Sequence, residues 1–326
     1  MPLINRCGGG GGTPQLCGQV ENFKAGLGNL SAILSWTAPS PDEDNSFVGA
    51  RIVRKTSSAP TGINDGTVVY EGTALTYTDT GLTAGTTYYY RAFAYNAKKK
   101  YQTEYRVASR TAIALNPNFA DNTWERIMEA CHSGGVLDTW VVGDSKTMTI
   151  DGVNYQFDIV GKNHDTYTDG GIAPLTFGLH DCYGTEHQMN NTNTNEGGWN
   201  GSKMRTKTIP AILAKMPENI QNGIRAVNKL YPTRSSSDFT ILTTADKLFL
   251  YSHDEVYGPD GNEGKQYDYY KAGNSKVKKV GSTASRWWLR SYQRYTTGGF
   301  YVVNTSGRVE TITADISAGV AFAFCF

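Results

Sequence analysis

The stretch Val320-Ala321-Phe322-Ala323-Phe324-Cys325-Phe326 contains no polar residue, and it closes an aromatic-rich block that begins at Gly281. Neither face of such a strand carries side chains that can hydrogen-bond to water, so we expect both faces to be buried in a core. Between this run and Trp287-Trp288-Leu289-Arg290-Ser291 lie Tyr, Arg, Thr, Asn, Ser and Asp residues, which are typical of recognition surfaces. The pattern predicts a binding segment, 285–326, displayed on a packed frame.

The composition favours β structure. Among 326 residues there are 36 Gly and 20 Tyr, which are more typical of strands and turns than of helical bundles. This length predicts two or three domains, and we take two as the working number. The net charge of +1 argues against a nucleic-acid-binding surface. The sequence lacks a run of eighteen apolar residues and a basic-then-apolar leader, so we predict neither membrane insertion nor a secretory signal.

The N-terminal segment 1–14 contains five consecutive glycines and is predicted to be a flexible lead. It lacks the GK[ST] ending of a phosphate-binding loop, so that interpretation is disfavoured. The five cysteines are odd in number and widely spaced, which predicts free thiols formed in a reducing cytoplasm. A Cys7–Cys17 pair under oxidising conditions is the alternative.

Residues 15–112 show short alternating apolar runs separated by turn residues, which predicts an all-β sandwich. The segment resembles a fibronectin type III domain in three places: Trp36 before Thr-Ala-Pro, the turn 79–82 (DTGL), and the strand 87–91 (TYYYR). The resemblance implies that Trp36 fills the core and that one of the tyrosines forms a corner hydrogen bond. It implies a spacer domain without chemistry of its own.

Residues 113–326 are predicted to form an α+β domain. A capped amphipathic helix is expected over 121–131, and helices are expected through 205–213 and 218–227. Strands are expected over 139–144, 146–150, 154–161 and 243–252, with a hairpin at Asp151-Gly152. The C-terminal run 320–326 is expected to be a single strand.

From Trp124 onward, the order of segments resembles a domain of uncharacterised function in tail proteins of phages and prophages of gut bacteria, which has a C-type-lectin-like fold. The matching stretches are 140–144, 159–165, 173–177, 197–199 with 202–205, 246–250 with 255–258, and 287–291. Members usually end in Gly-Val-Arg-Pro-Ala-Phe, whereas here Gly319-Val320 is followed by Ala-Phe-Ala-Phe. This departure adjoins the polar, aromatic segment.

Phage domains of this fold are also display scaffolds of diversity-generating retroelements, in which template-directed mutation rewrites codons near the C-terminus of a variable protein. The resemblance therefore implies that exposed side chains in this segment vary while the frame stays fixed, because exposed substitutions cost little stability. The alternative is that these residues form ordinary polar turns. The candidate ligand-binding residues are Tyr292, Gln293, Arg294, Tyr295, Thr296, Thr297, Asn304, Ser306, Asp315 and Ser317.

Three patterns suggest chemistry and are disfavoured on spacing. His180-Asp181-Cys182 and His164-Asp165 resemble catalytic fragments, but neighbouring residues on a strand point to opposite faces. The five histidines show no HExxH pattern, so no metal site and no cofactor is predicted. The segment 260–264 (DGNEG) resembles part of a calcium loop, but the ligand pattern does not continue and a turn explains it equally well.

These observations predict a non-enzymatic receptor-binding protein, or adhesin, of a phage or prophage tail. It would be assembled in the bacterial cytoplasm and located in the virion tail. The expected partners are a host cell-surface glycan or protein and other phage tail proteins. A homo-oligomer, which would add avidity, is left open. The alternatives are a tail-associated glycan depolymerase and a bacterial surface adhesin.

Overall fold

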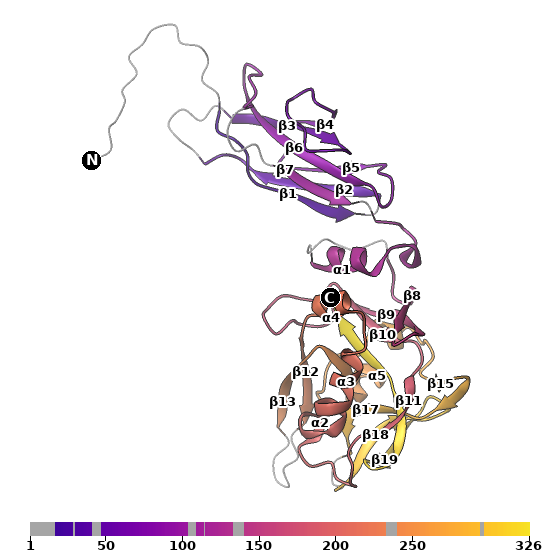
Figure 1. The fold of residues 1–326 in the computed structure, drawn as a ribbon. Coiled ribbons are helices and arrows are strands. Elements are labelled where there is room, and N and C mark those ends of the chain that lie inside the picture. The colour runs from indigo at the N-terminus through magenta and orange to yellow at the C-terminus, as the bar shows by residue number, and fades with distance from the viewer. Residues whose placement is uncertain are drawn as a thin grey trace. The chain divides into compact units, whose positions relative to one another are not determined.

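The computed structural model describes residues 17–28, 30–40, 47–103, 109–113, 115–132, 140–232, 240–293 and 297–326. The predicted lead 1–14, and Cys7 within it, lie outside these ranges. The chain divides into two compact units, Met1–Pro117 and Asn118–Phe326 (Figure 1). The sequence prediction placed this boundary between residues 112 and 113.

The first unit is a β-sandwich. Its described strands are β1 (Glu21–Gly28), β2 (Ser31–Thr37), β3 (Phe47–Lys55), β4 (Thr67–Gly72), β5 (Thr76–Thr80), β6 (Thr87–Asn96) and β7 (Ser109–Ile113). They form one sheet in the order β1-β2-β5 and another in the order β4-β3-β6-β7. Alternating burial along β2 places Trp36 in the core at 4% exposure, as predicted. The Thr83 N–H donates to the Tyr88 hydroxyl at 2.9 Å, which is the expected tyrosine corner. This unit has a fibronectin type III-like fold.

The described residues of the second unit form two five-stranded sheets and two two-stranded ribbons. The first sheet has the order β14-β21-β10-β9-β8, the second has the order β11-β20-β17-β18-β19, and the ribbons are β12-β13 and β15-β16. The strands of the first sheet are β8 (Ser145–Ile150), β9 (Val153–Lys162), β10 (Leu175–Leu179), β14 (Leu248–Leu250) and β21 (Phe322–Cys325). Those of the second are β11 (Tyr183–Gln188), β17 (Trp287–Tyr292), β18 (Gly299–Val303), β19 (Val309–Thr313) and β20 (Ser317–Val320).

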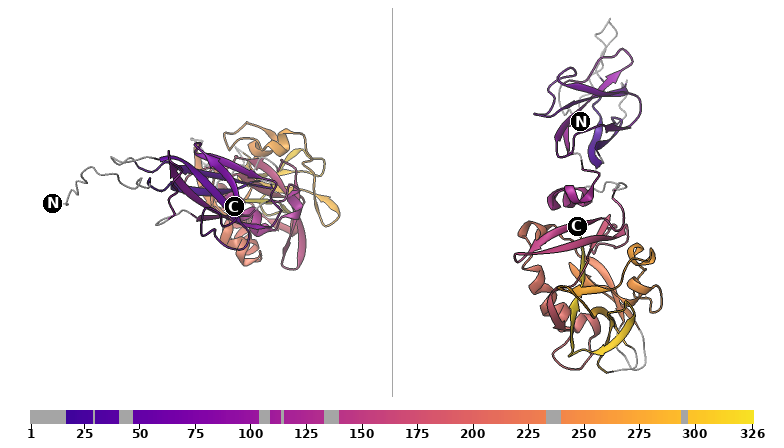
Figure 2. Two further views of the ribbon diagram at one scale, coloured as in Figure 1. Left: turned by 90° about the horizontal axis from the view of Figure 1, so that it is seen from above. Right: turned by 90° about the vertical axis from the view of Figure 1, so that its right-hand side faces the viewer.

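Short helices and the ribbons surround these sheets (Figures 1 and 2). The ribbon strands are β12 (Val227–Pro232), β13 (Ile241–Asp246), β15 (Lys278–Val280) and β16 (Thr283–Ser285). The helical elements are η1 (Phe119–Asp121), α1 (Trp124–His132), α2 (Gly198–Gly201), the π-helical turn η2 (Met204–Thr208), α3 (Ile209–Leu213), α4 (Glu218–Gly223), α5 (His253–Tyr257) and α6 (Asp268–Lys271).

The apolar run 320–326 is fully buried, as predicted, but it is not one strand. Val320 ends β20 in the second sheet, and Phe322 begins β21 in the first. In β21, Phe324 lies opposite Phe177 of β10 on one side and Leu248 of β14 on the other. Paired on both edges and covered on both faces, β21 must be apolar throughout. The run therefore joins the two sheets.

Several local predictions are confirmed and others are wrong. Asp151 and Gly152 both have positive φ, 52° and 77°, and form the expected tight turn between β8 and β9. The expected strand over 139–144 is instead a turn over 140–144, because Gly143 has a φ of 99° and the Asp144 carboxylate accepts the Val141 N–H. The expected helix over 218–227 ends at Gly223, and Val227 already begins β12.

Candidate functional site

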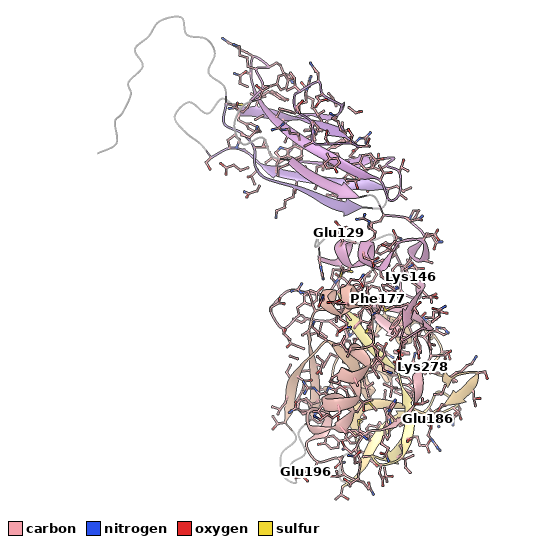
Figure 3. All side chains as sticks on the ribbon, in the orientation of Figure 1. Glu129, Lys146, Phe177, Glu186, Glu196 and Lys278 are labelled. Atoms are coloured by element: carbon pink, nitrogen blue, oxygen red, sulfur yellow. The ribbon has the colours of Figure 1, made fainter. Side chains whose placement is uncertain are left out.

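Three polar loops of the second unit meet at the second sheet and are joined by backbone hydrogen bonds. The Asn190 N–H donates to the Ala314 carbonyl at 2.9 Å, the Asn195 N–H to the Thr297 carbonyl at 3.1 Å, and the Ala314 N–H to the Gly298 carbonyl at 2.9 Å. We call the surface made by residues 190–196, 293, 297–298 and 314–316 the display face. Glu196 lies at the end of the second unit opposite to Phe177 (Figure 3).

The predicted binding residues divide between this face and its surroundings. Thr297 is exposed, and Gln293 and Asp315 are half-buried on the face. Arg294, Tyr295 and Thr296 lie outside the described residues. Three of the predicted residues thus come together with a loop, 190–196, that the sequence interpretation missed.

Tyr292 is a correction to the predicted set. Its side chain is only 5% exposed, and its ring packs edge-on against Phe300 with the centroids 6.3 Å apart. All six residues of β17 are buried, so the strand has no solvent face on which the tyrosine could be displayed. Tyr292 belongs to the frame.

Asn304 and Ser306 form the turn between β18 and β19. The Asn304 side-chain oxygen accepts the N–H groups of Ser306 and Arg308 at 2.9 and 3.1 Å and the Ser306 hydroxyl at 2.8 Å. This is the polar-turn role that the sequence left open as the alternative.

Asn304 and Ser317 also line a polar hollow of about 460 Å³. Glu186 and Glu310 line it too, and Glu310 is held by Arg286 at 3.1 Å. The Ser285 hydroxyl donates to Glu186. The hollow therefore brings two predicted residues together with two carboxylates that come from β11 and β19.

The missed loop 190–196 reads Asn-Asn-Thr-Asn-Thr-Asn-Glu. Asn191, Thr192, Asn193 and Glu196 are exposed, whereas Asn195 is buried and donates from its side chain to the Gly299 carbonyl at 3.3 Å. The run of Asn and Thr was a visible signal of a polar loop. Its adjacency to the C-terminal segment, about a hundred residues later, had no local signal.

Three of the stretches used for the phage-tail resemblance meet in a buried ionic network. The Lys229 ammonium contacts Asp165 at 2.8 Å and Glu255 at 2.6 Å, and Arg290 donates two hydrogen bonds to Glu255 at 2.5 and 2.8 Å. Burial raises the pKa of Glu255, but the charges of Arg290 and Lys229 outweigh it and lower that pKa to about 2. All four side chains are at most 3% exposed, so the network supports the frame and does not face a ligand.

The buried Asp254 carboxylate holds the segment 260–264 in place. Asp254 accepts the backbone N–H groups of Asp260, Gly261 and Glu263 at 2.9 to 3.1 Å. A loop that directs N–H groups inward is the reverse of a calcium loop, which presents oxygens. In the described part of the chain, no three His, Cys, Asp or Glu side chains gather as a metal group would require.

Glu263 provides a testable pH dependence. Burial raises the pKa of this carboxyl from 4.5 to about 7, against the opposing hydrogen bond from Ser291. The folded state then holds the Glu263 proton more tightly than the unfolded state, so its contribution to stability is lost as pH rises from about 4.5 to 7. Relative to Glu263→Gln, the free energy of unfolding should fall by about 3 kcal/mol over this range. Urea titrations at several pH values measure this, and parallel curves for the two proteins would contradict it.

The sequence fragment His180-Asp181-Cys182 does not act as one unit. His180 Nδ1 bonds to Asp158 at 2.8 Å, whereas Asp181 accepts the Lys279 N–H at 2.8 Å. Cys182 is buried, and burial raises the pKa of its thiol to about 12, which keeps it un-ionised. Cys17, Cys131, Cys182 and Cys325 are free thiols, as predicted. Within the described ranges no helix is long and apolar enough to cross a membrane.

Comparison with known proteins adds a family model for part of the second unit. Residues 174–326 match the model described as a domain of unknown function (DUF6273). None of the curated proteins matches the chain.

Solved structures give distant similarities. A fibronectin type III domain of human fibronectin type III domain containing protein 3 is 18% identical with a TM-score of 0.27, covering 35% of this chain and all of that one. A computationally redesigned β-sandwich protein is 23% identical with a TM-score of 0.24, covering 31% and 91%. A β-1,2-glucanase from Parabacteroides distasonis is 16% identical with a TM-score of 0.23, covering 33% and 14%. The assignment of the first unit therefore rests on its own strand order.

Proposed function

We propose that the protein is an adhesin that recognises a ligand on a cell surface through the display face of its second unit. The observation that carries this proposal is that three polar loops are joined to one another by backbone hydrogen bonds. The neighbouring strand β17 is buried along its whole length. Backbone hydrogen bonds and the buried side chains of Asn190 and Asn195 keep this surface in shape, so its exposed side chains are free to serve recognition. Asn, Thr and Ser supply adaptable hydrogen bonding.

The finer proposal is a receptor-binding protein of a phage or prophage tail, located in the virion tail and contacting other tail proteins. The second unit would then have the C-type-lectin-like fold, with retroelement-driven variation on its display face. The resemblance of the segments from Trp124 onward supports this proposal. Asp165, Glu255 and Arg290 of those segments are joined in the buried network, so the segments that carry the resemblance pack together in the frame.

Attachment to cells tests the display face. The labelled full chain is applied to a panel of gut bacterial strains, together with the triple variant Asn191→Arg, Thr297→Arg and Ile316→Arg. These side chains are exposed, so the variant should lose at least ten-fold in attachment while its thermal midpoint stays within about 2 °C. A matched control carries Thr67→Arg, Val68→Arg and Thr73→Arg on the first unit and should attach normally. Equal attachment by the two triple variants would contradict the proposal.

Sequencing the 3′ end of the gene across a population of the source phage or bacterium tests the retroelement. Substitutions confined to adenine-templated codons of exposed positions, such as Thr297 on the display face and Ser317 next to it, are expected, with the Tyr292 codon unchanged. A uniform 3′ end without a template repeat would leave an adhesin of fixed specificity.

The polar hollow supports a second candidate, the glycan depolymerase. Glu186 and Glu310 from different strands line the same cavity, and glycoside hydrolysis uses a pair of carboxylates. Release of reducing ends from purified host polysaccharide, abolished in Glu186→Gln and in Glu310→Gln, would establish it. Binding without release would favour the adhesin.

A further inference from the structure

A groove on the second unit shares no residue with the display face. It consists of two hollows, of about 520 and 540 Å³, which have Val153, Tyr155, Gly184 and Thr185 as common walls. Ile150, Ala211 and Ile212 give the first hollow an apolar floor, and Asn154, Gln156 and His180 line the second. The groove thus crosses β9 and β11, and both of its hollows are mainly apolar, with Asn154, Gln156 and His180 as polar groups on the wall of the second.

An aromatic pair forms the centre of the groove. The rings of Tyr155 and Tyr183 stack with their centroids 4.9 Å apart and an interplanar angle of 26°. Tyr183 is 8% exposed and packs on Phe322 of the core, so it fixes the half-buried Tyr155 ring from below. Gly184 has a φ of 52°, a left-handed conformation that favours glycine, and a Cβ there would make only an ordinary contact with the Tyr155 hydroxyl, at 3.9 Å.

The second hollow contains an oriented histidine. His180 is exposed, and its Nδ1 bonds to Asp158, a carboxylate only 3% exposed that also accepts from Gln156 at 3.3 Å. A buried carboxylate on one ring nitrogen fixes the ring orientation and the tautomer of the imidazole. Nε2 remains to meet a ligand in the hollow, because no side chain in the described part of the chain bonds to it.

Charged side chains of both signs line the groove: Asp151 and Lys215 in the first hollow, His180, Asp181 and Lys279 in the second, while Lys207 adds a further cation to the first. Asp151 and Lys215 pair at 2.8 Å across the first hollow, and Asp158 offsets His180, whose pKa it raises. A strongly charged ligand would have to compete with these pairs. A wholly apolar ligand would strip water from the Asn154, Gln156 and His180 side chains without replacing their hydrogen bonds, which disfavours its binding.

We propose that this groove binds a neutral saccharide chain. The C–H face of one sugar ring would lie on Tyr155, while hydroxyls of the next would bond to His180 Nε2 and to the amides of Asn154 and Gln156. A rigid aromatic ring beside a few fixed polar groups is the arrangement of small-molecule sites, and two connected hollows of this size accommodate several sugar rings. The site is independent of the adhesin proposal, because its lining residues are different.

Binding of the full chain to an array of several hundred neutral and acidic glycans tests the groove, with dissociation constants then measured by calorimetry for the best-bound oligosaccharide. The wild type should bind neutral glycans. Tyr155→Ala and His180→Ala should each weaken that binding at least ten-fold, whereas Tyr155→Phe, which keeps the ring, should change it less than three-fold. Thermal midpoints identify any variant that fails to fold, and Tyr89→Ala on the first unit serves as the matched control.

Three results would overturn the proposal: no neutral glycan bound by the wild type, full binding by Tyr155→Ala, or a preference for acidic glycans. The triple arginine variant of the display face should bind the same glycans as the wild type. Loss of glycan binding in that variant, with retention in Tyr155→Ala, would place the saccharide on the display face instead.

Discussion

Glu255→Gln is expected to destabilise the second unit by about 3–5 kcal/mol, which is the usual cost of removing one partner from a buried ion pair. The amide keeps the shape of the side chain but leaves the Arg290 guanidinium, which is 0% exposed, without a carboxylate. Besides the new amide oxygen, the carbonyl oxygens of Leu230, Leu250 and Glu263 would accept from it, and none of these groups carries a charge. Urea unfolding followed by tryptophan fluorescence measures the change, because five of the six tryptophans belong to the second unit.

Glu129→Gln is the matched control. Glu129 also pairs with an arginine, Arg126, at 2.7 Å, but its side chain is 50% exposed, so its loss should cost at most about 1 kcal/mol. Equal costs for the two variants would show that the buried network adds nothing to the stability of the frame.

Phe324→Ala is expected to lower the free energy of unfolding by about 3–5 kcal/mol, because it opens a cavity beside the first sheet. The Phe324 ring lies between those of Phe157 and Phe177, with centroid distances of 5.4 and 5.3 Å, and also contacts Trp124 and Phe326. It is fully buried, so the neighbouring rings cannot all collapse into the space it leaves. The midpoint of urea unfolding measures this loss.

Val141→Ala is the control that tests whether the loss of stability in Phe324→Ala comes from the burial of the side chain. Val141 is 56% exposed in the turn that was expected to be a strand, and its truncation should change stability by less than about 0.5 kcal/mol. A small effect at Phe324, comparable to that at Val141, would mean that the C-terminal run is dispensable for the core.

Local patterns in the sequence predicted much of the frame. Asp151-Gly152 specified a hairpin because both residues tolerate positive φ, and the absence of polar residues in 320–326 specified burial on both faces. The core position of Trp36 was implied by the resemblance of the residues around it to a fibronectin type III domain. In each case the physical cause lies within a few residues of the effect.

Contacts between distant segments could not be predicted in the same way. Lys229 meets Asp165 across 64 residues and His180 meets Asp158 across 22, and neither pair leaves a periodic signal. Tyr292 was misassigned for a related reason, since Arg290 and Ser291 beside it look like surface residues and are in fact buried by partners elsewhere in the chain. The display face and the groove depend on such long-range contacts.

The division of the C-terminal run between two sheets has a consequence for the order of folding during synthesis. Cys325 of β21 contacts Thr176 of β10, 149 residues earlier, and β20 pairs with β11 in the other sheet. Neither sheet can be completed until residues 317–325 have left the ribosome, and contacts of such long range form slowly. The first unit can fold while the second is still being synthesised. Each nascent chain would then carry a folded β-sandwich together with incomplete sheets whose apolar edges are still unpaired.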